Sequence, residues 1–195
     1  MKTSTNPFCS SESELPRSSP QLLVPVGNND HILGDVDAPV TLVEYGDYEC
    51  ANCFDAEPIV RALLQFHDRR LRFVFRYFPQ NSIYTRASLA AQAAEAAGAQ
   101  GKFWEMHDLL FRNRQSLAEA EMTHLALEIG LEIYRFNAEL AGGEYAARVH
   151  ADFVSGVQSG VNHTPTFFIN GVRTTGVRSL NVLSSAVERA LQGHA

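Results

Sequence analysis

Two cysteines separated by two residues, Cys50 and Cys53, are the side chains of this sequence whose type and spacing can do chemistry. A C-x-x-C pair can cycle between a dithiol and a disulfide, because one helical turn places its sulfurs close together. The same pair can be half of a structural zinc site, which needs two more ligands. The third cysteine, Cys9, lies in a polar tail, and the seven histidines are scattered without ligand spacing. The sequence therefore favours redox chemistry and no metal.

The residues around the pair indicate how Cys50 becomes reactive. Residues 39–45 are short, apolar and β-branched, which predicts a buried strand, and residues 50–67 have the apolar spacing of a helix that Pro58 should kink. Cys50 then lies at the start of a helix, where unpaired N–H groups and partial positive charge stabilise a thiolate. Cysteines in such positions have pKa values of about 3.5–7.5 instead of about 8.5.

Composition restricts the functional classes. The chain has 195 residues, 45% of them hydrophobic and 19% charged, which suits one soluble domain or a small domain with an insertion. Its net charge of −6 argues against nucleic acid as a partner. No apolar run is long enough for a membrane span, and the first twenty residues lack the apolar segment of a signal peptide. We therefore expect a cytoplasmic protein without a membrane partner, in which a close cysteine pair is more often catalytic or metal-binding than structural.

The rest of the chain divides into three parts. Residues 1–20 are rich in Ser, Thr, Pro and Glu, which predicts a disordered tail with Cys9 as an unpaired, solvated thiol. The order of the remaining elements is β-α-β, a helical block, then β-β-α, which predicts an α/β sheet layered with helices and an all-helical insertion. These elements are a strand at 71–78, helices over 83–158, strands at 166–169 and 172–175 joined by an Asn170–Gly171 turn, and a last helix from a Ser179 cap to 191.

Glu44 lies in the middle of the first predicted strand, six residues before Cys50. A carboxylate in a buried strand is costly unless it is paired or protonated. Burial would raise its pKa, so that it could take and return the proton of Cys53. The alternative is an exposed Glu44 that faces the edge of the sheet.

Four stretches together resemble the DsbA-like branch of the thioredoxin superfamily over about residues 22–192. They are VTLVEYGDYECANC, RLRFVFRYFP, AAEAAGAQGKFWEMHDLLF and SGVNHTPTFFINGV. The resemblance implies a thioredoxin fold with a helical domain inserted before the third core strand: residues 21–80 and 160–195 would form the thioredoxin-like domain, and 81–159 the insertion. It also implies a thiol–disulfide oxidoreductase without a cofactor, with protein or small-molecule disulfides or thiols as substrates and an electron donor that the sequence does not name. The buried acid of related family members matches Glu44.

The resemblance also implies that Pro165 is a cis-proline facing the cysteine pair, beside Thr164. A backbone held open there can pair with an extended substrate. From the residues alone, Pro165 could equally be a proline that begins a strand. Tyr48 could form an apolar rim for a peptide or belong to the core, and His163 could approach the thiolate or be merely solvated.

The spacer Ala51–Asn52 departs from the family pattern, which usually begins with Pro and often has an aromatic residue or His second. Asn52 cannot place a positive charge beside the thiolate. A less stabilised thiolate gives a less oxidising pair, which favours a reductase or isomerase. Two other functions stay open: a glutathione-linked transferase or isomerase on the same fold, and a redox-sensing or metal-holding binding protein. The glutathione-linked relatives generally use a single Ser or Cys, so the second cysteine counts against the first of these.

Overall fold

The computed structural model describes residues 20–81, 83, 85–174 and 180–193. Two predictions lie outside the described residues, the solvated thiol of Cys9 and the Ser179 cap. Of the disordered tail predicted for residues 1–20, only residue 20 is described. Within the described part, no helix has both the length and the apolar character that a membrane span requires.

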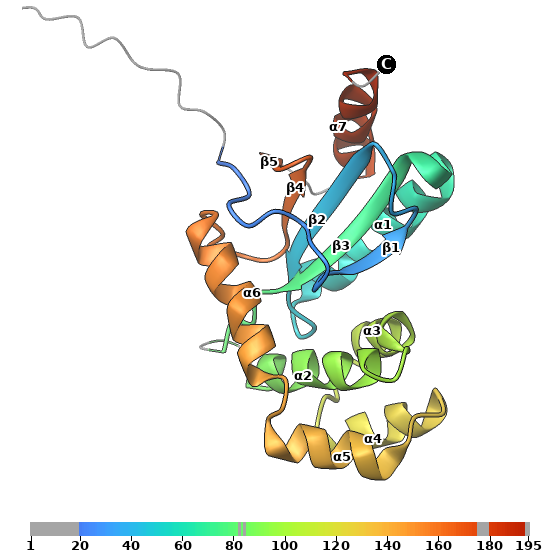
Figure 1. Ribbon diagram of the computed structural model, residues 1–195, viewed down its shortest axis with the longest axis vertical. Helices are drawn as coiled ribbons and strands as arrows, with labels where there is room; N and C mark the ends of the chain where they lie inside the picture. Colours follow the sequence, from blue (N-terminus) through green and yellow to red (C-terminus); the bar gives the residue numbers. More distant parts are fainter. Residues whose placement is uncertain (1–19, 82, 84, 175–179, 194–195) are drawn as a thin grey trace, which may run out of the picture.

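A five-stranded mixed sheet forms the centre of the molecule (Figure 1). The spatial order of the strands is β1-β3-β2-β4-β5; β2 and β3 are parallel, and every other neighbouring pair is antiparallel. The strands are β1 (His31–Gly34), β2 (Val40–Gly46), β3 (Leu71–Tyr77), β4 (Thr166–Ile169) and β5 (Val172–Thr174).

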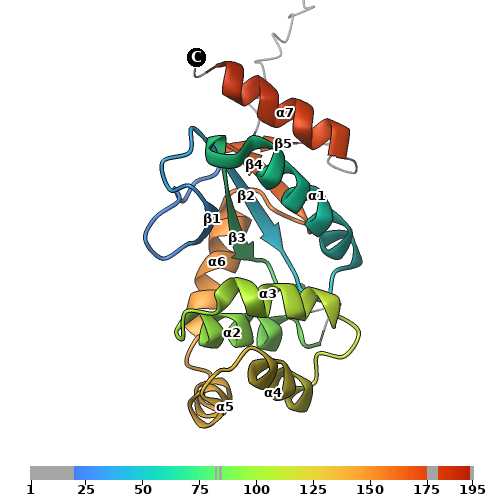
Figure 2. The ribbon, with the colours of Figure 1, turned by 90° about the vertical axis from the view of Figure 1, so that its right-hand side faces the viewer.

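Side chains of β2 alternate between two buried faces, because successive residues of a strand point to opposite sides. Val40 and Leu42 pack in the larger core cluster with α1 (Ala51–His67) and α7 (Leu180–Gln192). Val43 and Tyr45 pack in a second cluster with Phe153 of α6 (Ala146–Gln158), on the opposite face of the sheet from α1 (Figure 2). Both faces of β2 are therefore covered, and a polar residue on either face is removed from water.

Of the helices between β3 and β4, α2 to α5 form a group at one end of the sheet, and α6 extends from this group along one face of the sheet (Figure 1). Ala-rich α2 lies at the centre of this group, since its small side chains allow α3, α4, α5 and α6 to pack against it. These helices lie within residues 81–159, and the boundaries predicted for the insertion stay a prediction. They are α2 (Ala87–Gly98), α3 (Phe103–Arg112), α4 (Glu119–Glu128), α5 (Ile133–Gly142) and α6.

The thioredoxin fold with a helical insertion is therefore confirmed, and so are the strands predicted on either side of the first helix. Asn170 and Gly171 form the predicted hairpin turn, with φ of 46° and 81°. Helix α1 includes Pro58 and is followed by one 3-10 turn at Asp68–Arg70, and the predicted kink at Pro58 stays a prediction. One detail differs from expectation. Edge strand β1 was not predicted, because its four residues are too few to show an alternating pattern.

Candidate active site

Cys50 is the N-cap residue of α1, in the turn that follows β2. Its backbone is extended (φ −72°, ψ 120°), and its carbonyl accepts a hydrogen bond from the Phe54 N–H at 3.1 Å, which begins the helix. Only 3% of Cys50 is exposed, and 1% of Cys53, one turn further along α1. Both cysteines are free thiols. The predicted strand–loop–helix delivery of Cys50 to a helix start is confirmed.

The second side of the site is the loop before β4. Thr166 pairs with Tyr45 near the end of β2, so the residues just before Thr166 lie beside the turn that carries Cys50. The Thr164–Pro165 peptide bond is cis, and the Thr164 carbonyl oxygen lies 3.6 Å from Cys50 Sγ, where it can accept a hydrogen bond from Cys50 only while that thiol is protonated. The cysteine pair and the proline loop, more than 100 residues apart in sequence, thus share one site.

The two thiols have opposite electrostatic environments. A hydrogen bond from the Cys53 thiol, together with Thr164 and the backbone N–H groups of Cys53 and Asn52, lowers the pKa of Cys50 to about 5, although burial opposes this. Burial, the hydrogen bond to Cys50 and the charge of Glu44 raise the pKa of Cys53 well above its usual value. At neutral pH Cys50 is a thiolate and Cys53 a thiol, which fits an attacking and a resolving cysteine.

Glu44 lies on the same face of β2 as Val40 and Leu42, beneath α1, and is only 3% exposed. The alternative of an exposed, edge-facing Glu44 is therefore wrong. Burial, and then the charges of Glu57 and Cys50, raise its pKa well above the usual value, while a hydrogen bond with Cys53 opposes the shift. Its Oε1 has no hydrogen-bond partner. A protonatable carboxyl in contact with the resolving thiol can exchange a proton with it.

Comparison with known proteins identifies the family. A family model described as Thioredoxin matches residues 27–189. The chain belongs to the thioredoxin family. The structure of a thioredoxin-like oxidoreductase from Silicibacter pomeroyi DSS-3 is 29% identical, with a TM-score of 0.76, and the match covers 85% of this chain and 94% of that one. The fold of α-DsbA1 from Wolbachia pipientis is shared at a TM-score of 0.74 and 20% identity, over 91% of this chain and all of that one.

Curated relatives are longer proteins. One, named Na(+)/H(+) antiporter NhaA 1, from Salinispora arenicola, is 44% identical over 173 residues. That match covers 88% of this chain but 26% of the antiporter. This thioredoxin-family chain therefore spans about a quarter of the length of that relative.

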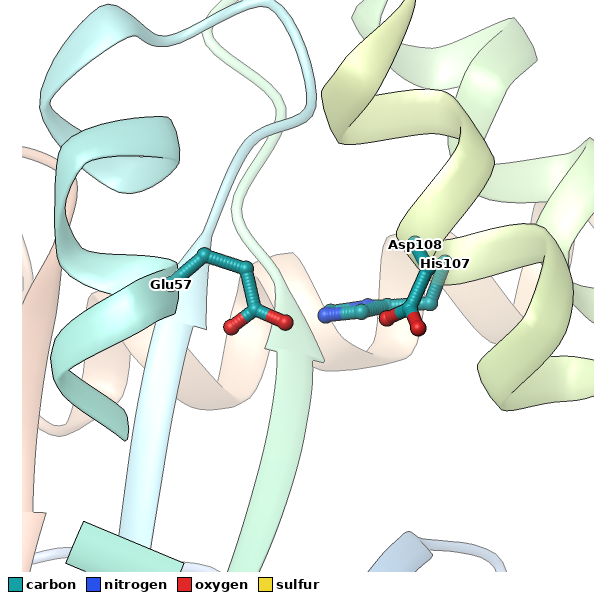
Figure 3. Close-up of side chains that lie close together, drawn as sticks. All are labelled: Glu57, His107 and Asp108. Atoms are coloured by element: carbon teal, nitrogen blue, oxygen red, sulfur yellow. The ribbon is translucent and has the colours of Figure 1, made fainter. Parts of the chain in front are cut away.

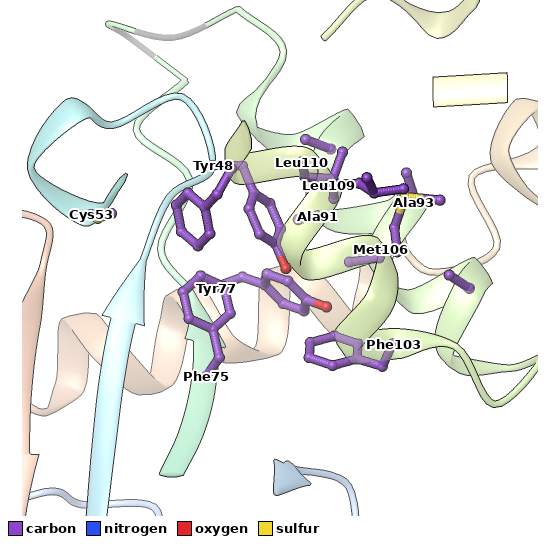
Figure 4. Close-up of a cluster of buried hydrophobic side chains, with 14 of the residues drawn as sticks. Tyr48, Cys53, Phe75, Tyr77, Ala91, Ala93, Phe103, Met106, Leu109 and Leu110 are labelled. Atoms are coloured by element: carbon purple, nitrogen blue, oxygen red, sulfur yellow. The ribbon is translucent and has the colours of Figure 1, made fainter. Parts of the chain in front are cut away.

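Tyr48, predicted as a substrate-binding residue, belongs instead to the core. It is 1% exposed, its hydroxyl lies 3.0 Å from His107 Nδ1, and its ring packs against Phe111. Its ring also packs against Phe75 (Figure 4). The apolar rim interpretation is wrong because the helical insertion covers this ring.

His163 lies on the surface of the loop before β4. Its Nδ1 is 2.8 Å from Asn162 Oδ1, and its carbonyl accepts a hydrogen bond from Thr166 Oγ1. None of these contacts reaches Cys50. A role for His163 toward the thiolate stays a prediction, whereas Thr164 contacts Cys50 directly.

A group of potential metal ligands occurs away from the cysteines. Glu57 of α1 and His107 and Asp108 of α3 point toward one another, with ligand atoms within 4.8 Å (Figure 3). Arg61 already donates hydrogen bonds to both carboxylates, so a guanidinium holds the position of a cation. Among the described residues, neither cysteine belongs to a group of three or more such ligands.

Sequence reasoning missed two polar residues that connect the halves of the site. Asp47 accepts hydrogen bonds from the backbone N–H groups of Glu49 (2.8 Å) and Gln80 (2.9 Å). The Gln80 side-chain amide donates to Thr164 Oγ1 at 2.6 Å. Gln80 therefore joins the turn before Cys50 to the proline loop. A usable signal existed: Asp47 and Gln80 follow two neighbouring parallel strands, whose carboxyl ends meet at one edge of the sheet.

Asp47 is expected to influence the thiolate. Burial is the main cause that raises its pKa to about 6, and Cys50 adds to the shift through like-charge repulsion. In Asp47→Asn this repulsion is gone, so we expect the pKa of Cys50 to fall further below 5 and the pair to become more oxidising. Thiolate absorbance near 240 nm, followed from about pH 3 to 9, measures this pKa. A rise in the pKa of Cys50 in the variant would contradict the expectation.

The lowered pKa of Cys50 also makes the stability of the reduced protein depend on pH. The pKa of Cys50 is about 5 in the folded chain, against about 8.5 in an unfolded one. The thiolate therefore stabilises the fold fully above about pH 8.5, and this contribution is lost as pH falls to about 5. Denaturant unfolding of the dithiol form should show this trend, and Cys50→Ser should lack it.

Proposed function

We propose that the chain reduces or isomerises disulfides, with Cys50 as the attacking thiolate and Cys53 as the resolving thiol. The observation that carries this proposal is the opposite perturbation of the pKa values of two thiols beside the Thr164–Pro165 cis peptide bond. The Cys50 thiolate attacks a substrate disulfide and forms a mixed disulfide, releasing one substrate sulfur as a thiolate that takes a proton. Cys53 passes its proton to Glu44, attacks Cys50 Sγ and releases the second substrate thiol. The pair has then supplied two electrons, which a separate thiol donor must replace.

The direction of the reaction depends on how well the dithiol form is stabilised. The sequence predicts a weakly oxidising pair, because Asn52 brings no charge. The backbone N–H groups and the Cys53 thiol nevertheless lower the pKa of Cys50 to about 5, between the values of about 3.5 for DsbA and about 7 for thioredoxin. We therefore place the potential between about −120 mV and about −270 mV, the values of those two proteins. This range suits isomerisation and reduction.

The glutathione-linked transferase remains the second candidate, and it requires one nucleophile. The buried proton acceptor Glu44 next to Cys53 favours use of both cysteines. The metal-holding candidate has no support among the described residues around the pair.

Insulin reduction by dithiothreitol tests the proposal. The wild-type chain should accelerate the precipitation of the insulin B chain, Cys50→Ser should not, and the purified protein should contain less than one zinc ion per ten chains. A chain that leaves the rate unchanged, or that binds one zinc ion per cysteine pair, contradicts the proposal. The cytoplasmic location stays a prediction.

A further inference from the structure

The first turn of α1 and the loop after α3 meet next to the cysteine pair. Phe54 directly follows Cys53, and its backbone N–H donates a hydrogen bond to the Cys50 carbonyl at 3.1 Å. Side chains of a helix tilt toward its N-terminus, so the Phe54 ring leans toward the turn that carries Cys50. Phe54 is 37% exposed, although both cysteines are buried. Its ring therefore forms part of the surface that a molecule meets when it approaches the pair.

Arg114, in the loop after α3, lies over this ring. Its guanidinium carbon is 5.2 Å from the centroid of the Phe54 ring, which is a cation–π contact. Within the described part of the chain, the Arg114 side chain forms no ion pair and no hydrogen bond. The Arg61 guanidinium, by contrast, contacts the carboxylates of both Glu57 and Asp108. Arg114 thus carries a positive charge that no described carboxylate of the chain neutralises.

The acidic residues closest to the cysteine pair in sequence have other partners or lie in solvent. Asp47 accepts two backbone hydrogen bonds, and Glu49 Oε2 accepts one from the Arg86 backbone N–H at 2.7 Å, just before α2. Asp55 is exposed, with no ion pair to a described residue. These charges, and the net charge of −6, repel an anionic molecule that approaches Cys50. A cation at this place offsets that repulsion.

The contact with Phe54 also prepares Arg114 for a ligand. An arginine side chain loses rotational freedom when it pairs with a carboxylate, and one that already rests on a ring has less freedom to lose. Its N–H donors match the two oxygens of a carboxylate. The Cys53 thiol and backbone N–H groups are the main groups that lower the pKa of Cys50. The charge of Arg114 is therefore available to a partner and is not needed by the thiolate.

We propose that Arg114 binds a carboxylate of the thiol or disulfide partner and so selects partners with an acidic group next to the reacting sulfur. The inference rests on the proposed disulfide exchange and narrows its substrate class. The carboxylate belongs to an acidic side chain of a polypeptide or to glutathione, which carries two carboxylates. Phe54 acts through Arg114, as the positioning residue that holds the guanidinium beside the pair.

Three disulfide-bonded peptides that differ only in the residue beside the cysteine, Glu, Gln or Lys, test the proposal at low ionic strength. The ratio of kcat/KM for the Glu peptide to that for the Gln peptide should be about threefold higher in the wild type than in Arg114→Gln, the size of effect expected for an exposed ion pair. Arg114→Gln should raise kcat/KM for the Lys peptide. Phe54→Leu should lower the Glu-to-Gln ratio in part, because the guanidinium loses its support. Salt at about 0.5 M should reduce all these differences.

Glutathione disulfide distinguishes the two sources of the carboxylate. A loss of kcat/KM in Arg114→Gln as large as that for the Glu peptide assigns the site to glutathione as well as to acidic polypeptides, and no loss restricts it to polypeptides. Iodoacetamide is neutral and alkylates the Cys50 thiolate by displacing iodide. Its rate should be the same in the wild type and Arg114→Gln, since the variant leaves the reactivity of Cys50 intact.

Arg69→Gln is the matched control. It makes the same charge change in the turn at the other end of α1, where Arg69 is exposed and has no ion pair or hydrogen bond with a described residue. Its ratio of Glu to Gln peptide should equal that of the wild type. Equal ratios in the wild type and Arg114→Gln, an equal effect of Arg69→Gln, or a slower reaction of Arg114→Gln with iodoacetamide and all peptides alike would overturn the assignment of Arg114. A wild type that reduces no disulfide would instead contradict the proposed function itself.

Discussion

A Cys53→Ala variant is expected to accumulate mixed disulfides with its substrates, whereas a Cys50→Ser variant should form none. In Cys53→Ala, Cys50 loses the hydrogen bond from the Cys53 thiol but its pKa is still lowered by Thr164 and the backbone N–H groups, so Cys50 still attacks, and no second thiol is present to release the substrate. Turnover should fall on the order of 10³-fold or more in both variants, because each step needs its own sulfur. Non-reducing gels of lysates with and without dithiothreitol, followed by mass spectrometry, measure the trapped species.

Cys9 requires a control, since it is the third thiol of the chain. The trapping experiment is therefore repeated in a Cys9→Ser background, in which the same adducts should form on Cys50. Adducts that disappear in this background, or that accumulate in Cys50→Ser, contradict the assignment of Cys50 as the attacking residue. Trapped partners would also identify the natural substrates.

A Glu44→Gln variant should release substrate on the order of 10²-fold more slowly, since a positioned acid–base group typically contributes 10²- to 10⁴-fold. The amide that replaces the carboxylate cannot accept the proton of Cys53, whose pKa is raised by burial. Attack by Cys50 should be nearly unaffected, so the mixed disulfide should accumulate transiently. Single-turnover kinetics with a peptide disulfide from about pH 6 to 9 separate the two steps.

Stability provides an independent check on Glu44. Because its pKa is raised in the folded chain, ionisation disfavours the fold: stability is highest below the unfolded pKa of about 4.3 and declines as pH rises toward the folded value. Glu44→Gln should remove this decline and be more stable than the wild type at pH 7. The exposed Glu105 of α3 supplies the control Glu105→Gln. Equal rates of substrate release in the wild type and Glu44→Gln at every pH would show that Glu44 does not accept the proton of Cys53.

Much of the site follows from local sequence. Cys50 and Cys53 lie at a strand–helix junction that periodicity alone reveals, and the position of Glu44 within β2 determines which face it occupies. The wrong prediction concerned Tyr48. Its neighbours in sequence place it near the cysteines, but only the packing of α3 decides that its ring is buried.

The contacts that sequence did not reveal are all long-range. Asp47 and Gln80 meet because β2 and β3 are parallel and end together, and Gln80 reaches Thr164 across 84 residues. The strand order could have indicated the contact between Asp47 and Gln80, whereas no local pattern indicates the contact between Gln80 and Thr164. The charge of Glu57 likewise raises the pKa of Glu44, an effect that depends on the folded arrangement of the two side chains.

The redox equilibrium of the pair with glutathione tests the central claim most directly. Purified protein is equilibrated in buffers of different ratios of reduced to oxidised glutathione, quenched in acid, alkylated and weighed by mass spectrometry. We predict two principal species that differ at Cys50 and Cys53, the dithiol and the intramolecular disulfide, which interconvert at one potential between about −120 and −270 mV. A pair that stays reduced across the whole series, or that forms only stable glutathione adducts on Cys50, would contradict a cycling disulfide.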